Sequence, residues 1–139
     1  MLYKLMILCG LLSLLAACSG AAPELPVINV TTSGMQFQPA RLELVAGQPV
    51  RLTLTNSDAL EHDFSLMEFA VEGSVKTVGL AGHDTGHASD EPAVHVGAAA
   101  NGQGTIEFTP SQPGTYEFIC TVAGHKEAGM VGSLVVNAP

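Results

Sequence analysis

From residue 27 onward, the sequence consists of short runs of alternating apolar and polar residues, separated by residues that favour turns. In the run 50–55, Val50, Leu52 and Leu54 share one face and polar residues occupy the other. This period of two predicts half-buried β-strands. No segment after the first seventeen residues keeps a helical period over several turns. The pattern therefore predicts an all-β fold, a sandwich or a barrel.

The strands can be placed from the alternation and from the turn residues between them. One long interval, 79–102, breaks the pattern because Gly, Ala, Asp and three histidines dominate it. We interpret this interval as an excursion from the sandwich that contains one short strand at 93–96. The other predicted strands are 27–31, 41–45, 50–55, 62–66, 105–108, 115–120 and 131–137.

Length and charge limit the class of protein. A chain of 139 residues has room for one domain. The formal net charge is −8, and phosphates would be repelled by so acidic a surface, which argues against a nucleic-acid partner. The same charge is compatible with attraction to a basic protein partner.

The N-terminal segment predicts export. The apolar run 5–17 is too short to span a bilayer and has the length of the apolar part of a signal peptide. It ends in Leu-Ala-Ala followed by Cys18, which resembles a bacterial lipobox. Cys18 is then acylated and becomes the mature N-terminus, anchoring the domain to a membrane surface. The alternative is a plain signal peptide cleaved near residue 17. We therefore predict a leader at 1–17, a short tether at 18–26 and one domain at 27–139.

One cysteine remains for the folded domain. Cys9 leaves with the leader and Cys18 takes the lipid, so Cys120 has no partner for a disulfide. A lone thiol in an oxidising compartment is a buried inert residue, a liability or a metal ligand. The residues that follow Cys120 favour the role of metal ligand.

Cys120 begins a C-x4-H-x4-M arrangement that continues through His125 to Met130, between two predicted strands. Thiolate, imidazole and thioether together select copper, and two histidines, one cysteine and a distant methionine form the blue-copper ligand set. His62, at the start of a predicted strand, is the candidate for the second histidine. Each residue alone has an ordinary structural role. Their joint occurrence, with export and a β-sandwich pattern, predicts one copper site.

The stretch 27–137 resembles the cupredoxins, small type 1 (blue) copper proteins that include plastocyanin, azurin, the auracyanins and the sulfocyanins. The resemblance rests on the C-x4-H-x4-M loop, on Glu-His-Asp-Phe at 61–64 and on Pro-Gly-Thr-Tyr at 113–116. It implies a Greek-key β-sandwich or barrel. It also implies that His62 and His125 bind copper through Nδ1, Cys120 as thiolate and Met130 axially. Many family members carry Asn after the first histidine where this chain has Asp63, which affects the hydrogen bonds around the metal.

The expected function is one-electron transfer, without enzymatic activity, between transient redox partners such as a cytochrome or a respiratory or copper enzyme. A monomer is expected. The runner-up is a copper carrier or copper-resistance protein of the cell envelope, in which His83, His87 and His95 form a weak secondary metal site. The alternative for those three histidines is a solvated loop. An accessory domain of a copper enzyme and a metal-free binding module are less compatible with the single mature cysteine.

Overall fold

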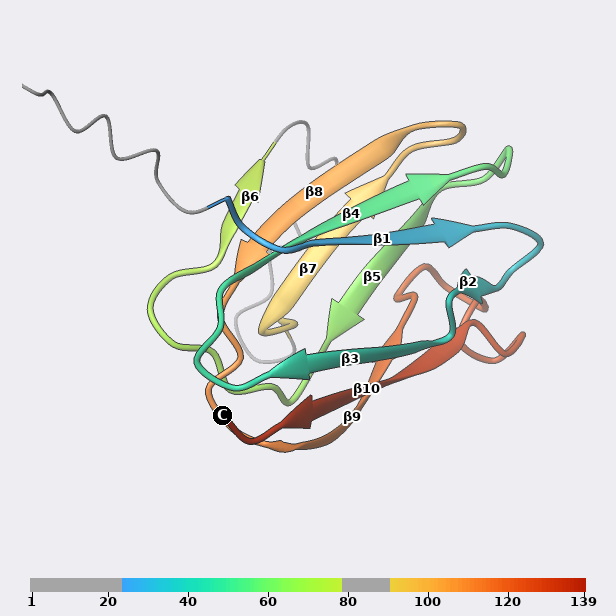
Figure 1. Cartoon of the computed structure of the whole chain (residues 1–139). Helices are drawn as coiled ribbons and strands as arrows, with labels where there is room; N and C mark the ends of the chain where they lie inside the picture. Colours follow the sequence, from blue (N-terminus) through green and yellow to red (C-terminus); the bar gives the residue numbers. More distant parts are fainter. Residues whose placement is uncertain (1–23, 79–90) are drawn as a thin grey trace, which may run out of the picture.

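The computed structural model describes residues 24–78 and 91–139, and these residues form ten β-strands and no helix. The strands make two five-stranded sheets packed face to face (Figure 1). Within the described ranges, nothing forms an apolar helix long enough to cross a bilayer.

The first sheet has the strand order β2-β1-β4-β8-β6, and the second has the order β3-β10-β9-β5-β7. Two pairings are parallel, β1 with β4 and β10 with β3, and the other pairings are antiparallel. The bounds are β1 Val27–Thr32, β2 Phe37–Gln38, β3 Arg41–Val45, β4 Val50–Asn56, β5 His62–Leu66, β6 Lys76–Val78, β7 Val94–Ala98, β8 Gln103–Phe108, β9 Gly114–Ile119 and β10 Val131–Asn137.

This arrangement confirms the predicted all-β sandwich. The sequence did not indicate β2 or β6, because strands of two or three residues are too short for a period of two to be recognised. The short strand expected at 93–96 within the interval 79–102 is present as β7, which extends to residue 98 and pairs along its length with β5. Residues 79–90 of that interval lie outside the described residues.

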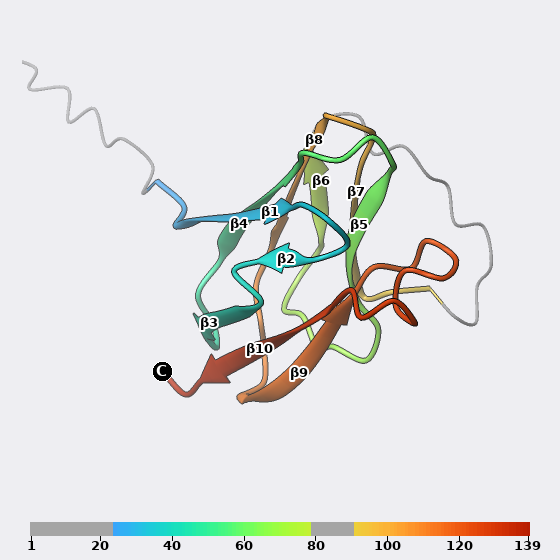
Figure 2. The same cartoon turned by 90° about the vertical axis from the view of Figure 1, so that its right-hand side faces the viewer.

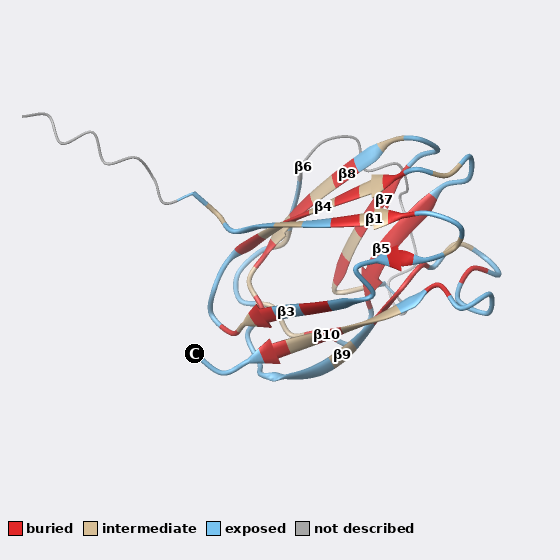
Figure 3. Ribbon diagram, turned by 45° about the vertical axis from the view of Figure 1, so that its right-hand side comes forward, coloured by how far each residue is buried: buried red, intermediate tan, exposed pale blue. Residues whose placement is uncertain are grey.

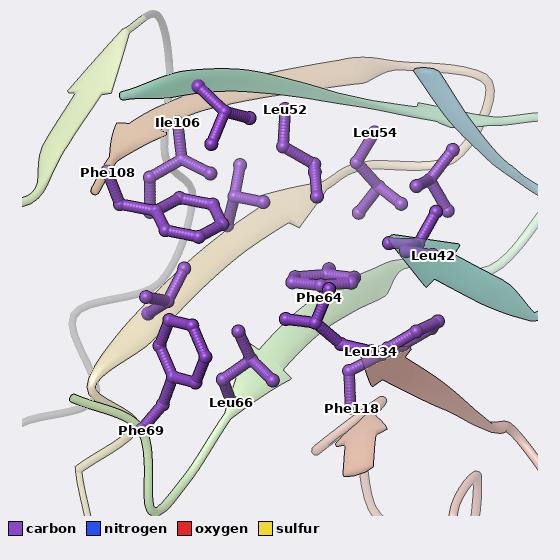
Figure 4. Packing of buried hydrophobic residues seen from close by; sticks show 14 of the residues in the cluster. Leu42, Leu52, Leu54, Phe64, Leu66, Phe69, Ile106, Phe108, Phe118 and Leu134 are labelled. Carbon is purple, nitrogen blue, oxygen red and sulfur yellow. The ribbon is translucent and has the colours of Figure 1, made fainter. Parts of the chain in front are cut away.

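The core lies between the two sheets, where buried segments face one another (Figure 3). Strand β4 buries every second residue, as the alternation predicts. Three aromatic rings, Phe37, Phe64 and Phe118, pack together with ring-centre separations of 4.7 to 6.2 Å. Figure 4 shows Phe64 and Phe118 close to Leu134 within this core. Because close-packed interiors resist deformation, the cluster gives the adjacent loops a stiff base.

Four loops meet at one end of the sandwich: β1–β2, β4–β5, β7–β8 and β9–β10 (Figures 1 and 2). Hydrogen bonds link the first three, since Gly34 of the β1–β2 loop donates to the Asp58 carboxylate of the β4–β5 loop, and Asn101 of the β7–β8 loop donates to the Asp58 carbonyl. The C-terminus lies at the opposite end (Figure 1). The four residues predicted as copper ligands, His62, Cys120, His125 and Met130, lie at the end where these loops meet.

Candidate metal centre

Three potential metal-binding side chains converge at this end of the sandwich. His62 Nδ1 lies 3.1 Å from His125 Nδ1, and Cys120 Sγ lies 3.4 Å from His125 Nδ1 and 4.0 Å from His62 Nδ1. All three residues are buried. Among the described residues, no other group of three His, Cys, Asp or Glu side chains brings its ligand atoms so close together.

The spacing of these atoms fits a transition-metal ion. A point equally distant from the corners of a triangle with these sides lies about 2 Å from each, the length of a metal–nitrogen bond. Two imidazoles and one thiolate are donors that copper binds in a trigonal arrangement. The donor set is therefore that of a copper site, and the spacing of its atoms leaves room for a metal ion between them.

Strand pairing positions the donors. His62 is the first residue of β5 and Cys120 directly follows β9, and these two strands lie side by side through the pairing of Ser65 with Ile119. Met130, fully buried, directly precedes β10. Its backbone N–H donates to the His125 carbonyl at 3.0 Å, and its carbonyl accepts from the Cys120 N–H at 3.2 Å. The fourth predicted ligand residue is thus adjacent to the other three.

The loop between β9 and β10 is closed by its own hydrogen bonds. The His125 N–H donates to the Val122 carbonyl, and the Gly129 N–H donates to the Lys126 carbonyl. Gly124 and Gly129 have φ angles of +83° and +94°, a region that favours glycine. These two glycines therefore let the backbone turn tightly around the site.

Asp63 connects strand β5 to this loop. Its backbone N–H donates to Cys120 Sγ at 3.4 Å. Its carboxylate accepts from the Thr121 N–H and the Thr121 hydroxyl, both at 2.8 Å, and from the Ser65 hydroxyl at 2.9 Å. The Asp side chain, which departs from the Asn of many family members, therefore ties strand β5 to the β9–β10 loop.

His95 lies away from the three donors. It belongs to β7, and its Nδ1 is 2.9 Å from the Ser65 hydroxyl. Because that hydroxyl donates its proton to Asp63, it accepts from the Nδ1–H of His95. His83 and His87, the other members of the hypothetical secondary metal site, lie outside the described residues.

The environment of Cys120 favours the protonated thiol when no metal is bound. Burial raises the pKa of Cys120 to about 11, against a partly offsetting hydrogen bond from the Asp63 N–H, and the negative Asp63 carboxylate adds to the rise. A bound cation is the largest local charge in such a site and deprotonates a coordinating thiol. Metal binding at Cys120 is therefore coupled to the release of a proton.

Two functional residues were missed in the sequence. Asn56 is buried and fastens the β4–β5 loop, since its amide donates to the carbonyls of Leu60, Ala98 and Ala99. The sequence contained an indication of this role. Position 56 continues the series of buried positions in β4, where an apolar residue is expected. Nothing in the sequence indicated a role for Asp58. Its Oδ2 lies 2.9 Å from His62 Nε2, and the hydrogen bond from Gly34 lowers the pKa of its carboxyl.

A β-sandwich with a buried His-Cys-His cluster and a buried Met beside it, at the end of the sheets, defines the cupredoxin class. The family model described as "Copper binding proteins, plastocyanin/azurin family" matches residues 26–137. The chain belongs to this family, and its cofactor is a single type 1 copper.

Among curated relatives, the copper-resistant cuproprotein CopI of Rubrivivax gelatinosus is 38% identical over 108 residues, 78% of this chain and 64% of the relative. The chain thus spans slightly less than two thirds of that protein's length. Auracyanin-A of Chloroflexus aurantiacus is 32% identical over 127 residues, 86% of this chain and 78% of the relative. The solved structure of auracyanin A, a "blue" copper protein, superimposes with a TM-score of 0.59 at 28% identity, covering 82% of this chain and all of that one.

Proposed function

We propose that this protein carries single electrons through one copper ion, which His62 Nδ1, His125 Nδ1, the Cys120 thiolate and the Met130 thioether would hold. The observation that carries the proposal is the closure of the site: Cys120 and Met130 are fully buried, and His62 and His125 are 2% and 7% exposed. A catalytic metal site keeps one position open for substrate. A closed set of donors favours electron transfer over substrate chemistry.

The surrounding protein keeps the donors in place. The bound copper supplies the Cu(II)/Cu(I) couple. The hydrogen-bonded loop 121–130 and the aromatic cluster beneath it hold the donor atoms in one arrangement. The Asp63 N–H, directed at Cys120 Sγ, stabilises negative charge on the sulfur. Little atomic movement is then needed when the electron arrives or leaves.

His125 is the proposed point of electron entry and exit. Its neighbours Ala123, Gly124, Ala128 and Gly129 are exposed and small, so a partner surface can approach the imidazole closely. His125→Gly, loaded with copper, is expected to exchange electrons with a redox partner much more slowly than the wild type. Normal exchange rates in this variant, without added imidazole, would exclude His125 as the route.

The decisive test is a copper titration of the purified protein, followed by visible and electron paramagnetic resonance spectra. We expect an intense thiolate-to-copper band that disappears on reduction and is absent from Cys120→Ser. Colourless binding, or binding that survives Cys120→Ser, would contradict the proposal.

A second candidate function is copper carriage in copper resistance, which the CopI relative favours. The two functions differ in what leaves the protein, an electron or the metal. Slow copper release with reversible reduction supports the electron carrier. Rapid transfer of copper to a competing chelator or acceptor, in the oxidised or reduced state, supports the carrier of metal.

The proposal includes export and attachment to the membrane by a lipid on Cys18, so that transient protein donors and acceptors meet the copper site at the membrane surface. Lipidation is tested by mass spectrometry of the N-terminal peptide from the producing cells. Cys18→Ser should release the protein from the membrane fraction without changing the copper spectrum. A membrane-bound, unmodified protein would contradict the anchor.

A further inference from the structure

We propose that Asp58 is a positioning residue for the copper site: its carboxylate accepts the Nε2–H of His62, directs the free Nδ1 electron pair toward the metal, and favours the oxidised ion. This inference rests on the proposed role of His62 as a ligand. Asp58 belongs to the β4–β5 loop and is not itself a ligand of the metal.

The tautomer of His62 follows from its partner. Asp58 Oδ2 lies 2.9 Å from His62 Nε2, and a carboxylate only accepts hydrogen bonds. Nε2 therefore carries the proton. In the neutral ring, Nδ1 then has a free electron pair, and Nδ1 is the atom that faces His125 Nδ1 and Cys120 Sγ. The carboxylate thus selects the tautomer that the metal requires.

Asp58 is itself held in place from two neighbouring loops and from within its own. Its Oδ1 accepts the Gly34 N–H at 3.0 Å, and its backbone carbonyl accepts the Asn101 N–H at 3.0 Å. Its own N–H donates to the Asn56 side chain at 2.9 Å. A carboxylate fixed at both oxygens cannot rotate away from His62, so the orientation of the imidazole is set before metal binds.

The charge of Asp58 also acts on the metal. The His62 side chain is 1% exposed and that of Asp58 is 23% exposed, so water screens their contact only in part. A negative partner strengthens His62 as a donor and stabilises the higher charge of Cu(II). Removing the carboxylate is therefore expected to shift the equilibrium toward Cu(I).

The first experiment needs no variant. Nitrogen-15 spectra of the histidine rings in the copper-free and Cu(I)-loaded protein report Nδ1 and Nε2 of His62 separately. We expect the Nδ1 signal to move on loading and the Nε2–H to exchange slowly with solvent. An unchanged Nδ1 would show that His62 is not a ligand, which defeats the proposed function. A shifted Nδ1 with a rapidly exchanging Nε2–H would overturn the inference about Asp58 alone.

The second experiment compares reduction potentials of Asp58→Asn and Glu127→Gln. The two oxygens of Asp58 accept hydrogen bonds from Gly34 and His62, whereas asparagine has only one acceptor oxygen in its side chain. Glu127→Gln removes the same charge from an exposed residue near His125. We expect Asp58→Asn to favour Cu(I) about tenfold, equivalent to about 59 mV for one electron. The change in Glu127→Gln should be much smaller and should disappear in high salt. Equal shifts in the two variants, or none in Asp58→Asn, would overturn the inference.

Discussion

The two carboxylate oxygens of Asp63 both accept hydrogen bonds from Thr121, one from its backbone N–H and one from its hydroxyl, each at 2.8 Å. This pair joins the start of β5, which carries His62, to the loop that carries Cys120, His125 and Met130. The resemblance to cupredoxins left open whether an aspartate could make such a connection in place of asparagine. It does, and it brings a negative charge beside the Cys120 sulfur.

Asp63→Asn should therefore raise the reduction potential. The variant removes a negative charge that favours Cu(II), and it loses one of the hydrogen bonds that the carboxylate accepts. We expect a several-fold shift toward Cu(I), where a tenfold shift is about 59 mV. In the copper-free protein, the pKa of Cys120 should fall because the Asp63 charge helps to raise it. Protein-film voltammetry and absorbance titration of the thiolate measure the two quantities.

Ser65→Ala is the matched control for Asp63→Asn. It removes a hydrogen bond from the same carboxylate without changing its charge. If the effect on the potential arises from charge, Ser65→Ala leaves the potential nearly unchanged. A shift of equal size in both variants would assign the effect to hydrogen-bond geometry instead.

The stability of the copper-free protein should fall as the pH rises from about 9 to about 11. The folded protein holds the Cys120 proton up to a pKa of about 11, whereas the unfolded chain releases it near 9. In this range the folded state binds more protons than the unfolded state, so raising the pH favours unfolding. Below about pH 9 the contribution of Cys120 to stability is complete. Urea unfolding at pH 8 and at pH 10.5 measures the difference.

Copper-free Cys120→Ala separates this contribution from that of other groups titrating in the same range. Its free energy of unfolding should decline less between the two pH values than that of the wild type. The same decline in both proteins would mean that Cys120 has a normal pKa. In the copper-loaded protein the slope assigned to Cys120 should vanish above about pH 9, because the folded and the unfolded states then both hold Cys120 as the thiolate.

The sequence predicted the longer strands, and it predicted Cys120, His125 and Met130 as a group, because each of these features is local. Five or more alternating residues between turns suffice to place a strand, and the Cys120–His125–Met130 spacing lies within one loop. Asp58 could not be predicted in this way. Its role depends on a hydrogen bond to Gly34, 24 residues earlier in the chain, and on the meeting of the β1–β2 and β4–β5 loops. β7 was underestimated because Gly97 and the alanines after it give a weak strand pattern.

Gly132→Ala should destabilise the protein and disturb the copper site. A methyl group at position 132 would occupy the space of the Phe118 ring, which lies against this glycine across the β9–β10 pair. Phe118 also packs on Phe37 and Phe64 and lies two residues before Cys120. We expect a loss of roughly 1–3 kcal/mol in the free energy of unfolding, measured by urea denaturation.

The double variant Gly132→Ala/Phe118→Leu tests the cause. The smaller leucine makes room for the methyl group, so the combined loss should be less than the sum of the two single losses. Additive losses would mean that the methyl group is accommodated without displacing the Phe118 ring. Gly47→Ala provides the comparison. Gly47 has open space around it and a φ of +77°, so the loss of stability in this variant arises from backbone conformation alone.

Asn56→Ala should loosen the loop that leads to His62. The Asn56 side chain makes five hydrogen bonds: it accepts from the Thr32 hydroxyl and the Asp58 N–H, and it donates to three backbone carbonyls. Truncation leaves several of these partners buried without a replacement, each at a cost of about 1–3 kcal/mol unless water enters. We expect a loss of roughly 3 kcal/mol in stability and weaker copper binding, measured by unfolding and by competition with a copper chelator.

Thr32→Val is the control, because it removes one of the five hydrogen bonds and leaves the loop carbonyls bound to Asn56. It should cost about 1 kcal/mol and leave copper affinity unchanged. The comparison separates general stability from the placement of His62, since the Asn56 side chain, unlike that of Thr32, bonds to the Asp58 N–H and the Leu60 carbonyl. If Asn56→Ala lost stability but bound copper as tightly as Thr32→Val, the β4–β5 loop would be held in place without Asn56. The contacts from Gly34 and Asn101 would then suffice to hold Asp58 beside His62.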